Sequence, residues 1–149
     1  MKTISKTFSE LTLLEYHRIM TLRVAVFVVE QNCPYQEIDE TDLTSVHFWL
    51  EDAGEIKAYA RIYEAAGTVH FGRVIVAPAA RNQKLGTELL RQVLDWIAGN
   101  YPQQPIEIGA QAHLQKFYGQ FGFNAISEIY LEDDIPHVDM RLEKSSPAE

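Results

Sequence analysis

Apolar residues recur along the chain with two periods that change from segment to segment. Between residues 11 and 31 they stand three or four positions apart, which predicts a partly buried first helix. The β-branched stretch from Val24 to Val29 leaves the end of this helix open. Residues 32–44 carry turn formers and no sustained apolar face, so we expect a loop or short helix over a cleft.

The next three apolar runs are short and rich in aromatic and branched residues, as strands are. Runs 46–52 and 56–63 are separated by Ala53-Gly54-Glu55, which predicts a hairpin. A third run, 68–77, follows Gly67 and contains Val74-Ile75-Val76. This nearly continuous apolar stretch predicts a strand deep within the sheet.

The second half of the chain alternates between helical and strand patterns. Apolar residues at helical spacing from Leu85 to Ile97 predict a helix that ends at Gly99-Asn100, ahead of Pro102. We then expect a buried strand at 105–111, a short helix at 112–121, strands at 123–131 and 137–143, and a flexible tail at 144–149.

This order of elements predicts an α/β (α+β) fold with both antiparallel and parallel strand pairs. We expect a mixed central sheet of about six to seven strands flanked by helices. The chain has 149 residues and no internal repeat or linker, so residues 1–149 are expected to form a single domain.

Composition and charge exclude several classes of function. The single Cys33 cannot form an internal disulfide and no Cys/His spacing suits zinc, so we expect no metal. Neither an apolar signal core nor a run of eighteen apolar residues occurs, which favours a cytoplasmic protein that does not enter a membrane. Thirteen Lys and Arg against 21 Asp and Glu argue against binding nucleic acid and favour a cationic partner.

The junction between Val76 and Leu85 is the strongest candidate for binding chemistry. Unpaired N–H groups and the helix dipole make a helix N-terminus a site for a pyrophosphate. Gly86 permits close approach, while Arg81 and Lys84 add positive charge. A merely solvated basic helix start is the alternative interpretation, and no phosphate-loop motif is present.

A second motif lies where a strand passes into the short helix, from Gln111 to Phe123. Together the two segments resemble the GNAT superfamily of N-acetyltransferases, whose coenzyme A motif is Arg/Gln-x-x-Gly-x-Gly/Ala and whose second motif ends in Tyr-x-x-x-Gly-Phe. Residues 26–31, 109–115 and 135–137 resemble the ElaA-like branch. Two departures stand out, because Lys84 replaces the first motif glycine and Gln111 replaces an Asn.

The resemblance implies a single GNAT-like domain that takes acetyl-CoA as co-substrate and passes the acetyl group to an amine. The strand at Val74–Val76 would pair with the pantetheine arm, the turn from Arg81 to Thr87 would hold the pyrophosphate, and Gln111 and Phe117 would flank the arm. The implied cofactor-binding residues are Val74, Ile75, Val76, Arg81, Asn82, Gln83, Lys84, Leu85, Gly86, Thr87, Gln111 and Phe117.

Direct transfer to an amine needs an acid for the leaving thiolate and a base for the ammonium. The resemblance gives Tyr118 the acid role, and a hydroxyl with a pKa of about 10 stays protonated beside a thiol of about 8.5. A packed aromatic is the alternative. Glu30, Asp39 and His137 are candidate bases, although Glu30 could be a solvated helix terminus and His137 could simply hydrogen-bond the sheet.

Further alternatives remain open from the residues alone. A catalytic Cys33 would permit a two-step route, but no histidine partner is evident. Most of the acidic stretch from Glu37 to Asp42 is expected to be solvated, with some capacity to recognise a cation. A non-catalytic CoA-binding sensor or protein-interaction domain is the rival function. The acceptor amine is not identified, and monomer and homodimer are both compatible with the sequence.

Overall fold

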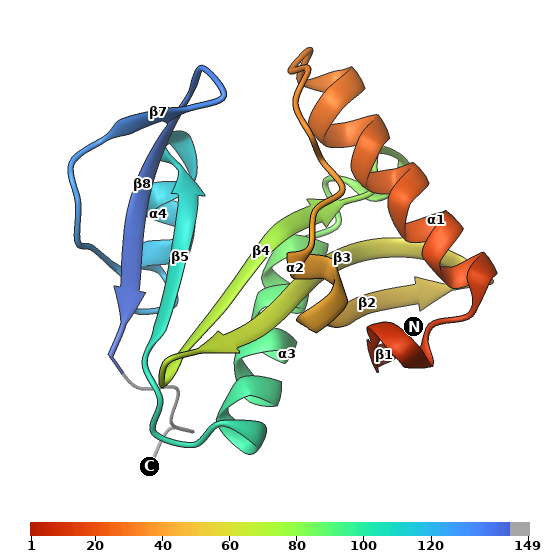
Figure 1. The fold of residues 1–149 in the computed structure, drawn as a ribbon, viewed down its shortest axis with the longest axis horizontal. Helices are drawn as coiled ribbons and strands as arrows, with labels where there is room; N and C mark the ends of the chain where they lie inside the picture. The colour runs from red at the N-terminus through yellow and green to blue at the C-terminus, as the bar shows by residue number, and fades with distance from the viewer. Residues whose placement is uncertain (144–149) are drawn as a thin grey trace. The chain divides into compact units, whose positions relative to one another are not determined.

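A computed structural model of the chain describes residues 1–143 (Figure 1). It contains two compact units, each made of two segments of the chain. Unit 1 comprises Met1–Tyr63 and Arg73–Val93, and unit 2 comprises Glu64–Gly72 and the chain from Leu94 onward. The single domain over 1–149 stays a prediction, and the expected flexible tail at 144–149 lies outside the described residues.

The described residues form eight strands and four α-helices. The strands are β1 (Lys2–Thr7), β2 (Val46–Asp52), β3 (Glu55–Ala65), β4 (Thr68–Val76), β5 (Ile106–Gln111), β6 (Asn124–Ala125), β7 (Tyr130–Glu132) and β8 (Ile135–Leu142). The α-helices are α1 (Leu13–Arg23), α2 (Thr41–Thr44), α3 (Leu85–Asn100) and α4 (Gln115–Gly119). A π-helical segment, η2 (Val24–Glu30), follows α1, and 3₁₀ turns occupy Phe8–Glu10, Pro78–Ala80 and Ala112–Leu114. Within residues 1–143, no helix has the length and apolar character needed to cross a membrane.

The strands form one mixed sheet, as the pattern of elements predicts. Its order is β1-β2-β3-β4-β5-β8-β6, and β7 pairs with β8. Strands β1 and β2, β2 and β3, and β5 and β8 are antiparallel, whereas β4 and β5 are parallel. The expected α/β sheet flanked by helices is confirmed, and β4 takes the interior place that its apolar run predicts.

The sheet has eight strands, seven on its main path and β7 beside it, against the expected six to seven. Strand β1 was missed because it is a polar edge strand whose residues are mostly exposed, and it pairs with β2 from Lys2–Glu51 to Thr7–Val46. The single strand expected at 123–131 is wrong. Its place is taken by β6 and β7, which pair with different parts of β8.

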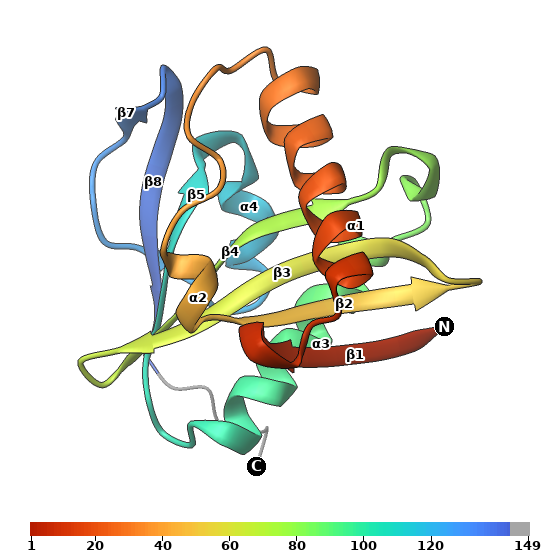
Figure 2. The ribbon, with the colours of Figure 1, turned by 45° about the vertical axis from the view of Figure 1, so that its right-hand side comes forward.

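Unit 1 has a core between its first helix and the strands β2, β3 and β4. Figure 2 shows α1 lying across β2 and β3. The buried residues of this core are Ile19, Met20, Val26, Trp49, Tyr59 and Ile75. The helix begins at a capping box in which the Thr12 side chain accepts from the Glu15 N–H and the Glu15 side chain accepts from the Thr12 N–H.

The helix predicted at 11–31 does continue past Arg23, but its last part is wound more widely. The N–H of Gln31 donates to the Val26 carbonyl at 3.2 Å, and the N–H of Cys33 donates to the Val28 carbonyl at 3.0 Å. Both bonds span five residues, which is the π-helical spacing. Branched side chains crowd an α-helix in this stretch, and Cys33 is buried directly after it.

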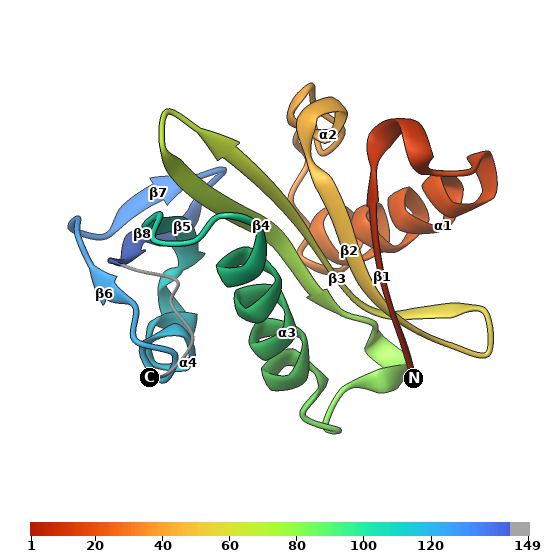
Figure 3. The same cartoon turned by 90° about the horizontal axis from the view of Figure 1, so that it is seen from below.

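Unit 2 is built on β5 and β8 with α4 beside β5 (Figure 3). The register of β5 and β8 runs from Ile106–Leu142 to Gln111–His137. The buried apolar residues of unit 2 are Val69, Phe71, Ile97, Ile106, Ile108, Ala110, Tyr118, Phe123, Val138 and Met140. The rings of Phe71, Tyr118 and Phe123 pack together, so this core is largely aromatic at α4.

Candidate functional site

The loop that leads into α3 reverses the backbone twice within three residues. Asn82 has φ +66° and Lys84 has φ +59°, both in the left-handed region. Such reversals let successive backbone N–H groups converge on an anion, as in the concave nests that bind phosphates. Leu85, Gly86 and Thr87 follow in the first turn of α3, where N–H groups lack helical partners. The geometry of the Arg81–Thr87 segment therefore suits a phosphate.

The backbone at Lys84 is left-handed, which is the conformation that favours glycine at this position of the motif. Glycine adopts φ near +60° freely, whereas a residue with a Cβ pays about 1–2 kcal/mol there. The Lys84 carbonyl accepts the first α3 hydrogen bond, from the Glu88 N–H at 3.2 Å. Lys84 thus takes the backbone role of a glycine and retains its charge.

Arg81 and Glu30 form a bidentate ion pair between the loop and the end of η2. The guanidinium nitrogens Nη1 and Nη2 donate to the two Glu30 carboxylate oxygens at 2.6 and 2.7 Å. Nε of Arg81 also donates to the Val76 carbonyl at 3.4 Å. The hydrogen bond from Arg81 holds the pKa of Glu30 below its ordinary value. Arg81 thus contacts two other predicted site residues, Glu30 and Val76, within unit 1.

Strand β4 contains a left-handed residue directly before Val74–Val76. Arg73 has φ +52°, although the glycine of this stretch is Gly72. A left-handed residue inside a strand rotates the peptide groups that follow and commonly marks a bulge or a strained functional position. Ile75 is buried, and Val74 and Val76 are half-buried.

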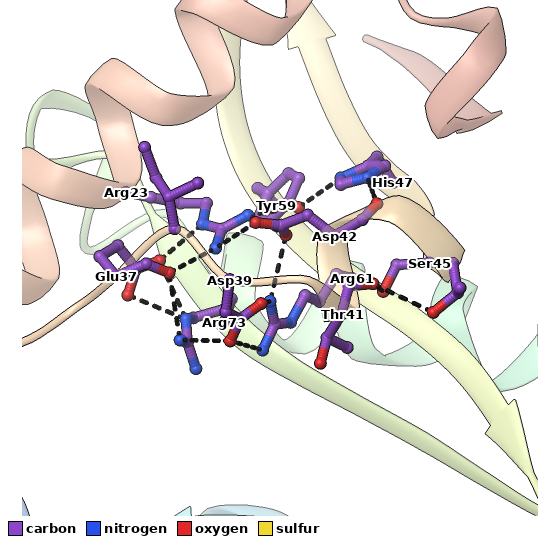
Figure 4. Close-up of polar contacts among 12 residues, drawn as sticks. Arg23, Glu37, Asp39, Thr41, Asp42, Ser45, His47, Tyr59, Arg61 and Arg73 are labelled. Carbon is purple, nitrogen blue, oxygen red and sulfur yellow. Dashed lines mark hydrogen bonds and ion pairs between the residues drawn. The ribbon is translucent and has the colours of Figure 1, made fainter.

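Unit 1 contains a closed ring of three arginines and three carboxylates, which we call the ionic ring (Figure 4). Arg23 donates to Asp42 and to Glu37, at 2.6 Å each. Arg73 lies 2.9 Å from the Glu37 carboxylate and 3.4 Å from Asp39. Arg61 closes the ring, at 2.6 Å from Asp39 and 3.1 Å from Asp42. Each member has two partners of opposite charge, and the formal charges cancel.

The ionic ring corrects the expectation that the acidic stretch is mostly solvated. The residues Glu37 and Asp42 are buried, and about a third of the Asp39 side chain is exposed. Burial alone would raise the pKa of Asp42, but hydrogen bonds and charge from Arg23 and Arg61 outweigh it and lower this pKa. The pKa of Asp39 is lowered in the same way, by Arg61 above all. These three carboxylates serve arginines of the chain itself.

A short hydrogen-bonded chain extends the ionic ring to His47. Nε2 of this imidazole lies 3.0 Å from the Asp42 carbonyl, which can only accept, so Nε2 carries the proton. Nδ1 then accepts from the Tyr59 hydroxyl at 2.7 Å. Burial lowers the pKa of His47, which favours this neutral form. Arg23 donates in turn to the Tyr59 oxygen at 3.4 Å.

Tyr118 lies in the aromatic cluster of unit 2, on α4. Its ring centroid is 5.2 Å from that of the half-buried Phe117 and 6.2 Å from that of Phe123. Burial raises the pKa of Tyr118 above its ordinary value of 10.0. The hydroxyl is therefore protonated throughout the neutral range, which is the state that a proton donor requires.

His137 and Gln111 are cross-strand neighbours where β5 ends. Nδ1 of His137 lies 2.7 Å from the Ile135 carbonyl and so donates to it. This leaves Nε2, 3.6 Å from the Glu132 carboxylate, as the nitrogen that can take up a proton. The Tyr130 ring stacks on the imidazole.

The structure gathers the predicted residues into a group within each unit. Unit 1 brings together Glu30, Arg81 and Val76, and unit 2 brings Gln111 beside His137 and Phe117 beside Tyr118. Sequence reasoning missed the ionic ring. The signal was available, because Arg23, Arg61 and Arg73 each stand inside a segment that the apolar pattern buries, and a buried arginine needs carboxylate partners.

Comparison with known proteins gives consistent matches along nearly the whole chain. The acetyltransferase (GNAT) domain family matches residues 12–144. Protein ElaA of Escherichia coli K12 is 45% identical over 142 residues, which are 91% of this chain and 92% of ElaA. The crystal structure of E. coli ElaA superposes with a TM-score of 0.90 and 44% identity, over 95% of this chain and 99% of that one. An acyl-CoA N-acyltransferase from Pseudomonas aeruginosa has a TM-score of 0.90 and 43% identity, over 94% and 97% of the two chains.

Proposed function

We infer the function of this chain from one premise: it belongs to the GNAT acetyltransferase family. The resemblance to the ElaA-like branch is confirmed by the same similarities. We propose that the protein transfers the acetyl group of acetyl-CoA directly to a primary amine of a small molecule or peptide. The observation that carries this proposal is the twice-reversed loop of Arg81–Lys84 at the start of α3.

The donor site follows from that loop and from β4. The loop N–H groups and the first turn of α3 would bind the pyrophosphate, with Lys84 adding charge. Strand β4 pairs with β5 at Val69–Ile106 and His70–Glu107, which come before the residues proposed to pair with the pantetheine arm. The named activity of the P. aeruginosa relative supports an acyl-CoA donor.

The chemistry needs two proton transfers around one bond exchange. The amine nitrogen would attack the thioester carbonyl, a C–N bond would form, the C–S bond would break, and the thiolate would take a proton from Tyr118. Backbone N–H groups of Val74–Val76 would stabilise the oxyanion. The ammonium proton would go to a base, for which we propose His137 or Glu30.

The two candidate bases are not equally suited to the task. The Nε2 atom of His137 can accept a proton. The carboxylate of Glu30 is held by Arg81, and its lowered pKa weakens it as a base. Alanine at each position, followed through the pH dependence of turnover, distinguishes them, because only the true base should alter the acidic limb.

Calorimetric titration with acetyl-CoA is the test that needs no knowledge of the acceptor. Saturable one-to-one binding is expected. Amines would then be screened by release of free CoA thiol, with spermidine, lysine-containing peptides and small arylalkylamines as probes. Absence of binding would overturn the proposal, and binding without CoA release from any amine would favour a CoA-binding sensor or protein-interaction domain.

A further inference from the structure

Arg73 is the residue at which the ionic ring meets β4. Its side chain donates from Nε to the Glu37 carboxylate at 2.9 Å and from Nη2 to the Glu37 carbonyl at 3.3 Å. Nη2 also donates to Asp39, and the guanidinium lies over the Tyr35 ring, 5.8 Å from its centroid. The same residue has the left-handed backbone of β4. A left-handed backbone and a side chain with three hydrogen bonds therefore coincide at one position.

We propose that Glu37 and Asp39 are positioning residues, which hold Arg73 left-handed and thereby aim the backbone of Val74–Val76. This inference rests on the proposed function, in which that backbone faces the thioester. Residues with a Cβ keep a left-handed conformation only where their surroundings impose it. At Arg73, the contacts to Glu37 and Asp39 hold the residue in this conformation.

The two anchors are themselves fixed from the opposite side. Glu37 accepts from Arg23 through its carboxylate at 2.6 Å and its carbonyl at 3.2 Å, and both side chains are buried. Asp39 accepts from Arg61 at 2.6 and 3.2 Å. The position of Arg73 is thus set by α1 and β3 through the loop that carries the carboxylates.

The conformation of residue 73 decides which way the next peptide groups face. Successive N–H groups point to opposite edges of a strand, so relaxing residue 73 to an extended conformation would turn the Val74 and Val76 amides away from their present side. A displacement of reacting groups by about 1 Å can lower turnover on the order of a hundredfold. The ionic ring would therefore act on catalysis without touching substrate.

A pair of substitutions at residue 73 separates this role from direct action of the guanidinium. Arg73→Ala removes the guanidinium and its contacts to Glu37 and Asp39, and it keeps the Cβ that disfavours the left-handed conformation. Arg73→Gly removes the same contacts, but glycine adopts the left-handed conformation freely. Both variants leave Glu37 paired with Arg23 and Asp39 paired with Arg61, so neither creates an unpaired buried carboxylate.

The experiment measures kcat, the dissociation constant for acetyl-CoA and the HN–Hα couplings of residues 73–76. Arg73→Ala should lower kcat on the order of tenfold, and Arg73→Gly should be at least about fivefold faster than Arg73→Ala. Glu37→Gln and the milder Asp39→Asn should shift the couplings and lower kcat by several-fold. The control Glu55→Gln, which loses only an exposed pair with Lys57, should change neither.

Equal loss of kcat in Arg73→Gly and Arg73→Ala would overturn the proposal, because the guanidinium itself would then be required. Unchanged couplings at residues 73–76 in Glu37→Gln would also overturn it. These couplings are measured without substrate, so they report on the ionic ring even if the wild-type protein fails to bind acetyl-CoA. Failure to bind would count against the proposed function alone.

Discussion

The two units hold their candidate functional groups by different kinds of interaction. In unit 1, the ionic ring fixes a loop with little regular structure through charge-assisted bonds of 2.6–3.4 Å. In unit 2, Tyr118 is held by packing of its ring against the rings of neighbouring phenylalanines, which are uncharged. Hydrogen bonds to charges are directional, whereas apolar packing tolerates small shifts.

This difference predicts how each unit responds to mutation and to pH. Loss of a fully buried ionic-ring member such as Arg23 leaves carboxylates in a buried place without their main partner, which costs far more than the net value of the pair. Loss of a hydroxyl from an aromatic cluster leaves the packing in place. Unit 1 should therefore be fragile toward charge removal, and unit 2 toward changes of shape.

The largest effect is expected from Arg23→Ala. Arg23 is completely buried and contacts Glu37, Asp42 and Tyr59. Its removal should lower the free energy of unfolding by about 3–5 kcal/mol, measured by urea denaturation. Arg18→Ala on the same helix removes one exposed bond, to the Gly54 carbonyl, and should change stability by no more than about 0.5 kcal/mol. Equal effects of the two would contradict the comparison.

Tyr118→Phe keeps the aromatic packing of unit 2 and removes only the proton donor. Turnover should fall by about a hundredfold while the acetyl-CoA dissociation constant and the unfolding midpoint stay unchanged. Because burial raises the pKa of Tyr118, wild-type turnover should show no loss from this group up to about pH 10. Unchanged turnover in the variant would remove Tyr118 from the mechanism.

Gly122→Ala tests shape in unit 2. Gly122 has φ +96°, and an added Cβ would lie 3.1 Å from Cδ1 of Leu142. The substitution should lower the free energy of unfolding by about 1–3 kcal/mol. Gly119→Ala is the matched control, since nothing lies within 4 Å of its Cβ position at the end of α4. A harmless Gly122→Ala would show that the turn relaxes easily.

Acid should weaken unit 1 through the ionic ring. The pKa of Asp42 lies below its ordinary 3.8, so the unfolded state binds protons first as pH falls. Stability from this group is complete above about pH 5 and is lost as pH falls below 3.8 through the lower folded pKa. Asp42→Asn, which cannot titrate, should show a shallower loss of stability than wild type between about pH 5 and 3. Parallel profiles in urea denaturation would refute the assignment.

The smallest effect is expected from Lys84→Gly in the α3 loop. Glycine relieves the left-handed strain but makes the unfolded chain more flexible, so stability should change by less than about 1 kcal/mol. The backbone donors remain, and acetyl-CoA affinity should be retained. Lys116→Gly lies inside α4, where glycine relieves no left-handed strain, so the free energy of unfolding should fall by about 1 kcal/mol. An equal loss in both variants would mean that Lys84 bears no strain.

Regular elements with strong periodicity were predictable from local pattern alone. The helix at Leu85–Asn100 and the strands β2, β3 and β4 appear close to their predicted bounds, because apolar spacing and turn residues act over a few positions. The polar edge strand β1 carries no such pattern. The π-helical winding of Val24–Glu30 also escaped prediction, since local spacing does not distinguish it from an α-helix.

The candidate site also has a part that local sequence predicted and a part that it did not. The loop at 81–87 and the motif around Tyr118 are contiguous in the chain, so the residues alone indicated both. The ionic ring joins α1, the loop before α2, α2 itself, β3 and β4 across as many as 50 residues between Arg23 and Arg73. An arginine inside an apolar run shows that a partner is needed without showing which.

The sequence by itself therefore determined the mixed α/β fold, the interior place of β4 and the positions of two family motifs, all of which depend on neighbouring residues. Only the tertiary structure decided that Glu37 and Asp42 are buried, that Arg81 is paired with Glu30 and that Arg73 is left-handed. The physical reason is that charge pairing is a long-range choice. It is settled by which side chains the packed elements bring within hydrogen-bonding distance, and local periodicity does not encode that choice.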